Sequence, residues 1–297
     1  MRIVFIGCVK FSVSALRELL SLKSRSTRVV GIVSKFRSPL NSDFTSLIPL
    51  ARRHDIPCLF ADRVDEMEMA KWIRDLAPDV IYCFGWSHLL GPKILNIPPK
   101  GAIGYHPSPL PLNRGRHPII WTLALGLKRT ASTFFFMDQG ADSGDILSQE
   151  TIPVSTRDHA ASLYRKLTSV ARRQIRFFTP RLASGQFVRK KQNPKRANYW
   201  RKRTDLDGKI DWRMSAIGIY NLIRALWAPY SGAFCEFRGR RNRIWQARVH
   251  KFPLRNLEPG KVISVRGKTF TVKCGEHALT VVKHEFANVP RKGEYLL

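Results

Sequence analysis

The sequence predicts an α/β protein with a mostly parallel sheet in its first half and a smaller β-barrel at its carboxyl end. Up to residue 106, short β-branched runs alternate with segments whose apolar residues recur at helical spacing. This alternation is typical of parallel strands joined by helical crossovers, with helices on both faces of the sheet. Beyond residue 230, five short strand-like runs separated by glycines indicate a small antiparallel barrel.

The strands of the predicted parallel sheet are short apolar runs, which cover residues 2–6, 28–33, 57–60, 79–84 and 102–106. Apolar residues at helical spacing predict helices between them, over 13–22, 44–54, 67–76 and 88–95. The turn after the first strand, Gly7 to Ser12, lacks the spaced glycines of a dinucleotide-binding fingerprint. We therefore expect no nicotinamide cofactor.

A second group of elements follows the last parallel strand. Pro118 suits the first turn of a helix over 118–126, and strands are predicted over 130–137 and 146–154. A long amphipathic helix is expected over 157–182, bent or ended by Pro180 because proline lacks an amide hydrogen. Its predicted buried stripe consists of Ala160, Leu163, Leu167, Val170 and Phe177.

The chain is predicted to divide into a first domain over 1–185, a basic linker over 186–212 and a barrel domain over 213–297. The linker segment is polar, basic and poor in regular pattern. Ser215 can cap a helix that contains Ile217, Tyr220, Ile223 and Trp227. The barrel strands are expected over 232–237, 242–249, 261–265, 270–274 and 279–283.

Composition limits the class of protein. The 297 residues, with 44% hydrophobic and 25% charged, fit a globular protein with a sizeable core. No apolar run approaches the roughly 20 residues that span a bilayer, and residues 1–7 are too short and strand-like for a signal peptide. We expect a cytoplasmic protein without a membrane partner. The five cysteines have no metal-ligand spacing, so neither disulfides nor structural zinc are expected.

The net charge of +29 predicts an attraction to anions. One basic cluster contains Arg189, Lys190, Lys191, Lys195, Arg196, Arg201, Lys202 and Arg203, and a second contains Arg238, Arg240, Arg241 and Arg243. A solvated surface and a phosphate-binding surface are equally good interpretations of these clusters. A phosphate-binding surface would suit tRNA, and it would also suit a nucleotide-linked sugar.

The segment most informative about function ends the 102–106 strand. It reads Gly104-Tyr105-His106-Pro107-Ser108-Pro109-Leu110-Pro111, and it is followed by Asn113-Arg114-Gly115-Arg116. A second segment reads Met137-Asp138-Gln139-Gly140-Ala141-Asp142-Ser143-Gly144-Asp145. His106 stands at the carboxyl end of a predicted parallel strand, where open α/β sheets bind their ligands.

These segments resemble the active site of the folate-dependent formyltransferases. The similarity extends to Asn198-Tyr199-Trp200-Arg201-Lys202-Arg203, Asp207-Gly208-Lys209-Ile210-Asp211-Trp212, Ile219-Tyr220-Asn221-Leu222-Ile223-Arg224-Ala225 and Pro229-Tyr230-Ser231-Gly232-Ala233-Phe234. Both methionyl-tRNA and sugar-nucleotide formyltransferases have such segments. The resemblance implies an α/β formyltransferase domain, a C-terminal domain resembling an OB-fold, and transfer of a formyl group from 10-formyltetrahydrofolate to an amine.

The chemistry requires a donor for the formyl oxygen and a base for the attacking amine. By resemblance, His106 and Asp142 are the catalytic pair. A lone histidine at a strand end is more often structural, but the adjoining proline-rich loop favours catalysis. The family positions that bind the folate correspond to His88, Leu89, Leu90, Ser108, Pro109, Leu110, Pro111, Arg116, Asp138, Gln139, Gly140 and Ala141.

Two groups of residues in these segments have a second interpretation besides folate binding. Leu89 and Leu90 could cover a face of the pterin, or they could pack in the core. Asp138 and Asp145 could be metal ligands on spacing alone, but no histidine or cysteine completes a set, so we predict no metal.

Gly104 departs from the family motif, which reads Asn-any-His-any-Ser-Leu-Leu-Pro. The family asparagine helps to hold the formyl oxygen, and glycine has no side chain for that role. Another donor could have replaced it, the enzyme could be slow, or the fold could do something else. We expect replacement, with Asn113, His88 or a water molecule as the candidate donor.

The acceptor has two interpretations, of which an amino-sugar nucleotide is preferred to methionyl initiator tRNA. Gly104 departs from the pattern that the tRNA enzymes share, and the segment over 35–43 is shorter than the basic loop that those enzymes have there. The Cys83-Phe84-Gly85-Trp86-Ser87-His88 segment and the Tyr-His-Pro-Ser-Pro form of the motif resemble formyltransferases of polysaccharide synthesis, whereas the charge favours tRNA. A third interpretation is a catalytically silent, nucleic-acid-binding relative. The barrel argues against it, because it lacks exposed aromatics alternating with basic residues. The sequence does not predict the oligomeric state.

Overall fold

The computed structural model describes residues 1–22, 26–38, 42–253 and 256–297. The chain forms two compact units. The first consists of Met1–Pro118, Thr130–Ile152 and Arg165–Trp200, and the second of Ile119–Arg129, Pro153–Tyr164 and Arg201–Leu297. The segment 186–212, interpreted from sequence as a linker, therefore divides between the two units after Trp200.

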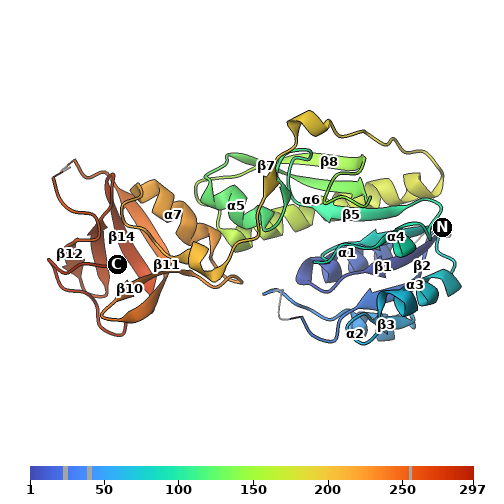
Figure 1. The fold of residues 1–297 in the computed structure, drawn as a ribbon, viewed down its shortest axis with the longest axis horizontal. Coiled ribbons are helices and arrows are strands. Elements are labelled where there is room, and N and C mark those ends of the chain that lie inside the picture. The colour runs from blue at the N-terminus through green and yellow to red at the C-terminus, as the bar shows by residue number, and fades with distance from the viewer. Residues whose placement is uncertain (23–25, 39–41, 254–255) are drawn as a thin grey trace. The chain divides into compact units, whose positions relative to one another are not determined.

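The first unit is built on a seven-stranded sheet with the strand order β3-β2-β1-β4-β5-β7-β8 (Figure 1). Its strands are β1 (Arg2–Ile6), β2 (Arg28–Ser34), β3 (Cys58–Phe60), β4 (Val80–Cys83), β5 (Ala102–His106), β7 (Arg129–Phe136) and β8 (Ile146–Pro153). The strands from β3 to β5 pair in parallel, and β7 pairs antiparallel to β5. The predicted mostly parallel sheet is confirmed.

The strand order of this sheet places the candidate residues. The chain leaves β1 toward β2 and β3, and later returns to the other side of β1 with β4 and β5. Because these strands are parallel, their carboxyl ends share one edge of the sheet. Ile6, Cys83 and His106 end their strands at this edge.

The helices follow the predicted order, with two clear differences in length. They are α1 (Lys10–Ser21), α2 (Ile48–Arg53), α3 (Glu66–Asp75), α4 (Pro92–Leu95), α5 (Pro118–Ala124), α6 (Ala160–Ala183) and α7 (Ala216–Ala225). In α2 and α4 a proline occupies the first turn. Proline is common in the first turn of a helix because the backbone amides there have no acceptor within the helix, so its missing amide hydrogen costs no hydrogen bond. Residues 44–47 and 88–91, predicted as helix, therefore precede the helices.

The long helix α6 corrects the predicted buried stripe. Ala160, Leu163 and Leu167 are buried as expected, but Phe177 is 59% exposed and stacks against the Arg181 guanidinium. Val170 is only half-buried, and the buried face continues through Ala171, Ile175, Phe178 and Leu182, which recur every three or four residues as a helix of 3.6 residues per turn requires. The helix runs past Pro180 to Ala183, so that proline does not end it.

The second unit contains a five-stranded antiparallel sheet with the order β10-β11-β14-β13-β12. These strands are β10 (Ala233–Phe237), β11 (Arg240–His250), β12 (Val262–Arg266), β13 (Thr269–Lys273) and β14 (Ala278–His284). Ser215 Oγ accepts from the Gly218 amide at 3.2 Å and caps α7, which ends before Trp227. The five predicted strands and the cap are confirmed.

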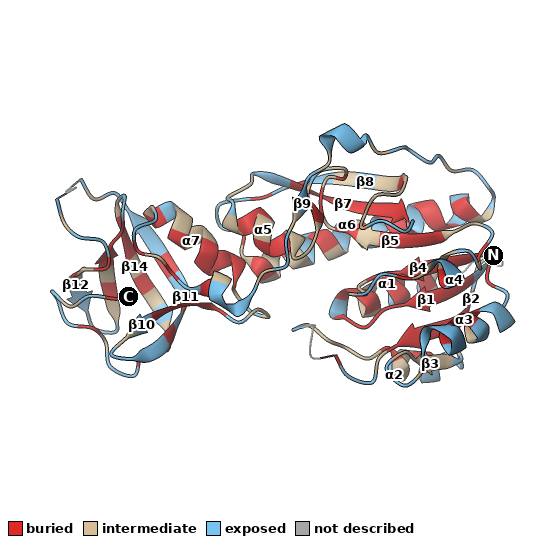
Figure 2. Cartoon of the chain, viewed as in Figure 1, coloured by how far each residue is buried: buried red, intermediate tan, exposed pale blue. Residues whose placement is uncertain are grey.

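Burial is strongest in the strands β1, β2, β4, β5 and β7 of the first sheet (Figure 2). All residues of β4 are buried, and so are all residues of β1 except Arg2, as expected for strands covered by helices on both faces. No helix in the described part of the chain combines the length and apolar character that crossing a membrane requires.

One buried carboxylate connects α1 to α6. The Glu18 side chain is 1% exposed, and each of its oxygens accepts a hydrogen bond at 2.8 Å, from Arg172 Nε and from Arg176 Nε. Burial favours the neutral acid, but these hydrogen bonds and charges outweigh it and hold the pKa of Glu18 below its ordinary value. Glu18 therefore stabilises the fold as a carboxylate.

We predict that Glu18→Gln lowers the free energy of unfolding at pH 7 by about 1–3 kcal/mol, because hydrogen bonds to a charged acceptor are lost. The folded-state pKa is depressed, so the contribution is present above the unfolded pKa and disappears as the pH falls through the folded value. Denaturant unfolding should show the difference between the two proteins fading below about pH 4. Glu150→Gln, whose carboxylate forms an exposed pair with Arg173, is the matched control and should change little.

Candidate active site

The side chain of His106, the last residue of β5, is held between two oxygens. Its Nε2 lies 2.8 Å from the Asn113 carbonyl oxygen, and its Nδ1 lies 3.5 Å from Asp142 Oδ2. A carbonyl oxygen only accepts hydrogen bonds, so Nε2 carries the proton in the neutral ring. Nδ1 then presents its lone pair toward the carboxylate, with room for a proton between them.

Asp142 is held by the main chain of a short strand that the sequence did not indicate. Its Oδ2 accepts from the Gly115 amide at 2.8 Å. Gly115 belongs to β6 (Arg114–Gly115), which pairs in parallel with β9 (Tyr199–Trp200). Asp142 itself has a φ of +57°, in the left-handed region that asparagine and aspartate tolerate better than most residues.

Asn113 is fixed by a reciprocal contact with Asn198. The Asn113 amide donates to Asn198 Oδ1 at 2.9 Å, and Asn198 Nδ2 donates to Asn113 Oδ1 at 3.2 Å. This contact holds the backbone whose carbonyl oxygen faces His106. Asn198 lies in the segment interpreted from sequence as linker, and although it begins a segment of family resemblance, nothing in the sequence placed it against Asn113.

The loop after His106 is held by hydrogen bonds and by buried side chains. Ser108 is buried, its Oγ donates to the Leu112 carbonyl at 3.0 Å, and its carbonyl accepts from Thr133 Oγ1 at 2.6 Å. Leu110 is buried beside Phe135 and Ile146. Of the predicted folate positions in this loop, Ser108 and Leu110 are therefore buried, whereas Pro109 and Pro111 are half-buried.

A second predicted folate segment follows β4. His88 is exposed, its Nε2 lies 2.7 Å from Lys35 Nζ, and Arg116 donates to the Ser87 carbonyl at 2.7 Å. Partial burial and the charges of Lys35 and Arg116 lower the pKa of His88. Leu89 is 67% exposed, whereas Leu90 is 6% exposed in the core. Of the two alternatives, packing in the core therefore applies to Leu90, and an exposed apolar side chain that could cover a ring is found only at Leu89 of this pair.

The third predicted segment is the turn from Asp138 to Ala141. Asp138 Oδ1 accepts from the Gly140 amide at 3.0 Å and from Ser143 Oγ at 2.7 Å, so this carboxylate shapes the turn. Gln139 and Gly140 are exposed, and Ala141 is half-buried. Asp145 lies at the end of the same loop. Within the described ranges, no three His, Cys, Asp or Glu side chains converge as a set that could hold a metal ion.

The cysteines near this edge of the sheet are unreactive. None of the five cysteines, all of which are described residues, forms a disulfide bond. Burial raises the pKa of Cys8 to about 11, and it also raises the pKa of Cys83. These thiols stay protonated at neutral pH, and a protonated thiol is a poor nucleophile.

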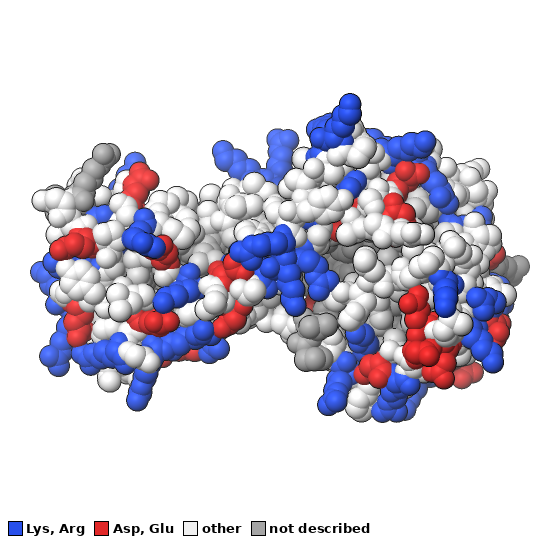
Figure 3. All heavy atoms as spheres, in the orientation of Figure 1, with Lys and Arg blue, Asp and Glu red and all other residues white. Residues whose placement is uncertain are grey.

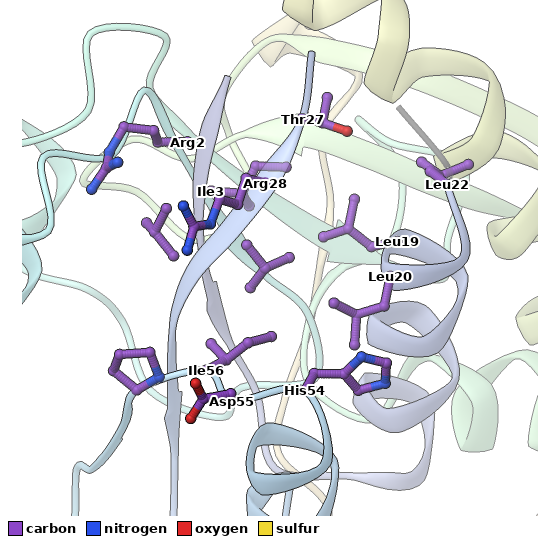
Figure 4. A pocket seen from close by; sticks show the side chains of 13 residues that line it. Arg2, Ile3, Leu19, Leu20, Leu22, Thr27, Arg28, His54, Asp55 and Ile56 are labelled. Carbon is purple, nitrogen blue, oxygen red and sulfur yellow. The ribbon is translucent and has the colours of Figure 1, made fainter. Parts of the chain in front are cut away.

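A cavity of about 390 Å³ lies elsewhere in the first unit (Figure 4). It is lined by the beginnings of β1 and β2, including Arg2, Ile3 and Arg28, and by residues 54–57. The amino ends of parallel strands are at the edge opposite their carboxyl ends, so this cavity is distinct from the site around His106.

Comparison with known families decides the assignment. The family model described as "Formyl transferase" matches residues 1–176, which is more than half of the chain. The chain belongs to the formyl transferase family. A second model, "Formyl transferase, C-terminal domain", matches residues 202–291.

Solved formyltransferases share this fold over most of the chain. A sugar 3N-formyl transferase, WlaRD, solved in the presence of dTDP and 5-N-formyl-THF, has 16% identity and a TM-score of 0.70, covering 95% of this chain and 96% of its own. The N-formyltransferase from Helicobacter canadensis in complex with folinic acid and dTDP-3-aminofucose has 16% identity and a TM-score of 0.72, covering 95% and 98%. Methionyl-tRNA formyltransferase from Clostridium thermocellum has 17% identity and a TM-score of 0.63, covering 84% and 94%.

The packing around Gly104 explains its departure from the family motif. Gly104 pairs with Phe135 across β5 and β7. A Cβ at residue 104 would lie 2.8 Å from Phe135 Cζ and 3.0 Å from Met137 Cγ, closer than carbon atoms pack. Phe135 and Met137 belong to an apolar cluster with Leu110 and Ile146. The volume that a side chain at this position would need is thus filled by apolar side chains.

Two of the donors considered for the formyl oxygen have other partners. The Asn113 side chain contacts Asn198, and His88 contacts Lys35. The replacement of the family asparagine by another donor stays a prediction. Because of this packing, an asparagine at residue 104 could not hold the formyl oxygen unless Phe135 or Met137 also changed.

We predict that Gly104→Ala destabilises the protein by about 1–3 kcal/mol, because overpacking a filled core displaces its neighbours. In an open strand the same change would stabilise by about 0.5–1 kcal/mol through lower backbone entropy in the unfolded chain. Denaturant unfolding measures the sign. The double variant Gly104→Ala with Phe135→Leu should cost less than the sum of its single changes. A stabilising effect of Gly104→Ala alone would contradict the packing described here.

Proposed function

We propose that this formyltransferase moves a formyl group from 10-formyltetrahydrofolate to the amine of an amino-sugar nucleotide. The observation that carries the proposal is the buried His106, whose Nε2 is committed to a carbonyl oxygen and whose Nδ1 faces Asp142. In a chain of this family, at the carboxyl edge of a mostly parallel sheet, that pair suits proton transfer at an attacking amine.

The reaction needs one proton acceptor at this position. The nitrogen lone pair of the acceptor attacks the formyl carbon, whose oxygen gains negative charge. As the new C–N bond forms, the amine proton passes to the Asp142 carboxylate, which shares it with His106 Nδ1. The C–N bond to the folate N10 then breaks, and the same proton returns to that nitrogen, which leaves a formamide and tetrahydrofolate. The oxygen requires a donor other than residue 104.

The loops beside the pair have the properties of a folate site. Leu89 offers an exposed apolar side chain for a planar ring, and its neighbour Leu90 anchors the segment in the core. Arg116 is tied to Ser87, and both Arg116 and Lys35 bring positive charge to this segment. An anionic co-substrate with a flat ring fits such a surface, and the two sugar formyltransferases of similar fold are described with a formylated folate.

The distribution of charge supports a small acceptor. Lys and Arg side chains occur over much of the face in Figure 3, with Asp and Glu among them. In the second basic cluster, Arg238 pairs with Glu294, Arg241 with Asp205 and Arg243 with Glu285. Arginines engaged by carboxylates are less available to a long row of phosphates, whereas a diphosphate requires only one or two cations.

The segment over 35–43 also entered the choice of acceptor, and its residues 39–41 lie outside the described residues. Methionyl initiator tRNA remains the alternative acceptor, since one protein of similar fold is a methionyl-tRNA formyltransferase. The silent, nucleic-acid-binding alternative predicts no transfer to either acceptor. The experiments below distinguish these outcomes.

We predict that His106→Ala and Asp142→Asn each lower kcat at least about 100-fold, because each removes part of the proton acceptor. Asparagine tolerates the left-handed backbone at residue 142, so Asp142→Asn changes the charge with little strain. Steady-state kinetics and folate titration measure the effects, with folate binding little changed. Exposed His54→Ala and Asp75→Asn are matched controls. Near-normal kcat in either active-site variant would remove that residue from the mechanism.

We predict that the protein formylates an amino-sugar nucleotide and not charged initiator tRNA when both are offered with 10-formyltetrahydrofolate. Binding of a diphosphate should depend weakly on salt, whereas a duplex gives a log–log slope of about −0.9 per neutralised phosphate. Product mass and the salt dependence of KM measure both properties. Formylated tRNA with a steep slope would make tRNA the substrate, and no transfer to any acceptor, with folate still bound, would favour the silent relative.

A further inference from the structure

Gln192 occupies the centre of a hydrogen-bonded network beside Asp142. Its Nε2 donates to the Asp142 carbonyl oxygen at 2.8 Å and to the Gly144 carbonyl oxygen at 2.7 Å. Its Oε1 accepts from Arg114 Nη2 at 2.8 Å and from Arg114 Nε at 3.2 Å. Both hydrogens and both lone pairs of the amide are thus used, which fixes its orientation.

Arg114 anchors this amide to the rest of the site. Its side chain is buried, and its Nη1 donates to the Tyr199 hydroxyl at 2.7 Å. The guanidinium also lies over the Tyr199 ring, 5.5 Å from the ring centroid. A planar guanidinium that donates through several nitrogens holds its partners in a defined geometry. Gln192 is therefore connected to a fixed group on one side and to the Asp142 loop on the other.

The Asp142 loop requires such support because its backbone is unusual. Asp142 has a φ of +57°, and a Cβ on Gly144 would lie 1.8 Å from the Phe136 carbonyl oxygen. The Gly115 amide holds the Asp142 carboxylate, and Gln192 holds the Asp142 carbonyl. The carboxylate and the main chain of one residue are thus fixed from two different segments.

We propose that Gln192 is a positioning residue, which fixes the main chain of residues 142–144 so that the Asp142 carboxylate faces His106 Nδ1. The inference rests on the proposed function for the role of Asp142. The Asp142 Oδ2 to His106 Nδ1 distance of 3.5 Å leaves little tolerance. A displacement of about 1 Å at a reacting group can cost on the order of 100-fold in rate.

Two substitutions separate this role from general stability. Gln192→Leu removes all four hydrogen bonds at similar size. Gln192→Glu keeps the acceptors for Arg114, but it places a carboxylate oxygen against the carbonyls of Asp142 and Gly144. Gln186→Leu makes the same chemical change at an exposed residue of the same segment and is the control. Folding is checked by thermal unfolding, and the arginine contact should keep Gln192→Glu nearly as stable as the unsubstituted protein.

The first readout does not depend on turnover. Amide hydrogen exchange of the peptide over 138–146 should be at least about tenfold faster in both Gln192 variants and unchanged in Gln186→Leu, because the loop opens more often without its donor. Unchanged exchange in both Gln192 variants would overturn the inference whatever acceptor the protein uses. This outcome is separate from failure of the proposed function, which is the absence of any formyl transfer.

The second readout is kinetic coupling to Asp142. Each Gln192 variant should lower kcat at least about tenfold. In the Asp142→Asn background, the same substitution should have almost no further effect, because there is no carboxylate left to position. Independent, additive losses in the double variant would mean that Gln192 acts on another part of the site and would overturn the assignment. If Asp142→Asn alone keeps full activity, the proposed catalytic pair fails, and the exchange experiment still decides whether Gln192 fixes the loop.

Discussion

The hydrogen bond between His106 Nε2 and the Asn113 carbonyl determines what the rest of the site can do. An imidazole has two nitrogens, and a neutral ring has one proton to place between them. The carbonyl takes that proton at Nε2 and leaves Nδ1 as the basic atom. The Asp142 carboxylate faces this Nδ1 atom, and the Asp142 backbone is held in the uncommon left-handed conformation.

This arrangement depends on segments that are far apart in the sequence. Asn113 is fixed by Asn198, and the Asp142 loop is fixed by Gly115 and Gln192. Asn113 and Asn198 directly precede the paired strands β6 and β9, and Gly115 lies in β6. The edge of the first sheet carries His106 and the Asp142 loop, and the β6–β9 pair helps to set the position of one relative to the other. This is the usual relation between a scaffold and the loops that carry its chemistry.

The sequence was sufficient for the sheet, the family and the position of His106, because these depend on local periodicity and on a contiguous motif. It was insufficient for Gln192 and for the contacts of Arg114 and Asn198, which lie in the quoted segments, since a two-residue strand has no periodicity from which its pairing could be predicted. Phe177 was placed in the core by a stripe that followed the wrong register, and the true face passes through Phe178. The reason for Gly104 also required the structure, because Phe135 and Met137 are its neighbours only across the sheet.

The pairing of β6 with β9 has a consequence for the order in which the site can form. During synthesis, the sheet strands, His106 and Asp142 all emerge before Gln192 and Asn198, whose contacts span 50 and 85 residues of sequence. Closing such distant contacts late in folding is entropically costly and slow compared with forming local helices. A nascent chain that has reached residue 185 therefore contains His106 and Asp142 without Gln192 and Asn198. The complete arrangement around His106 forms only when the segment over 186–200 has been made and has folded back onto the first sheet.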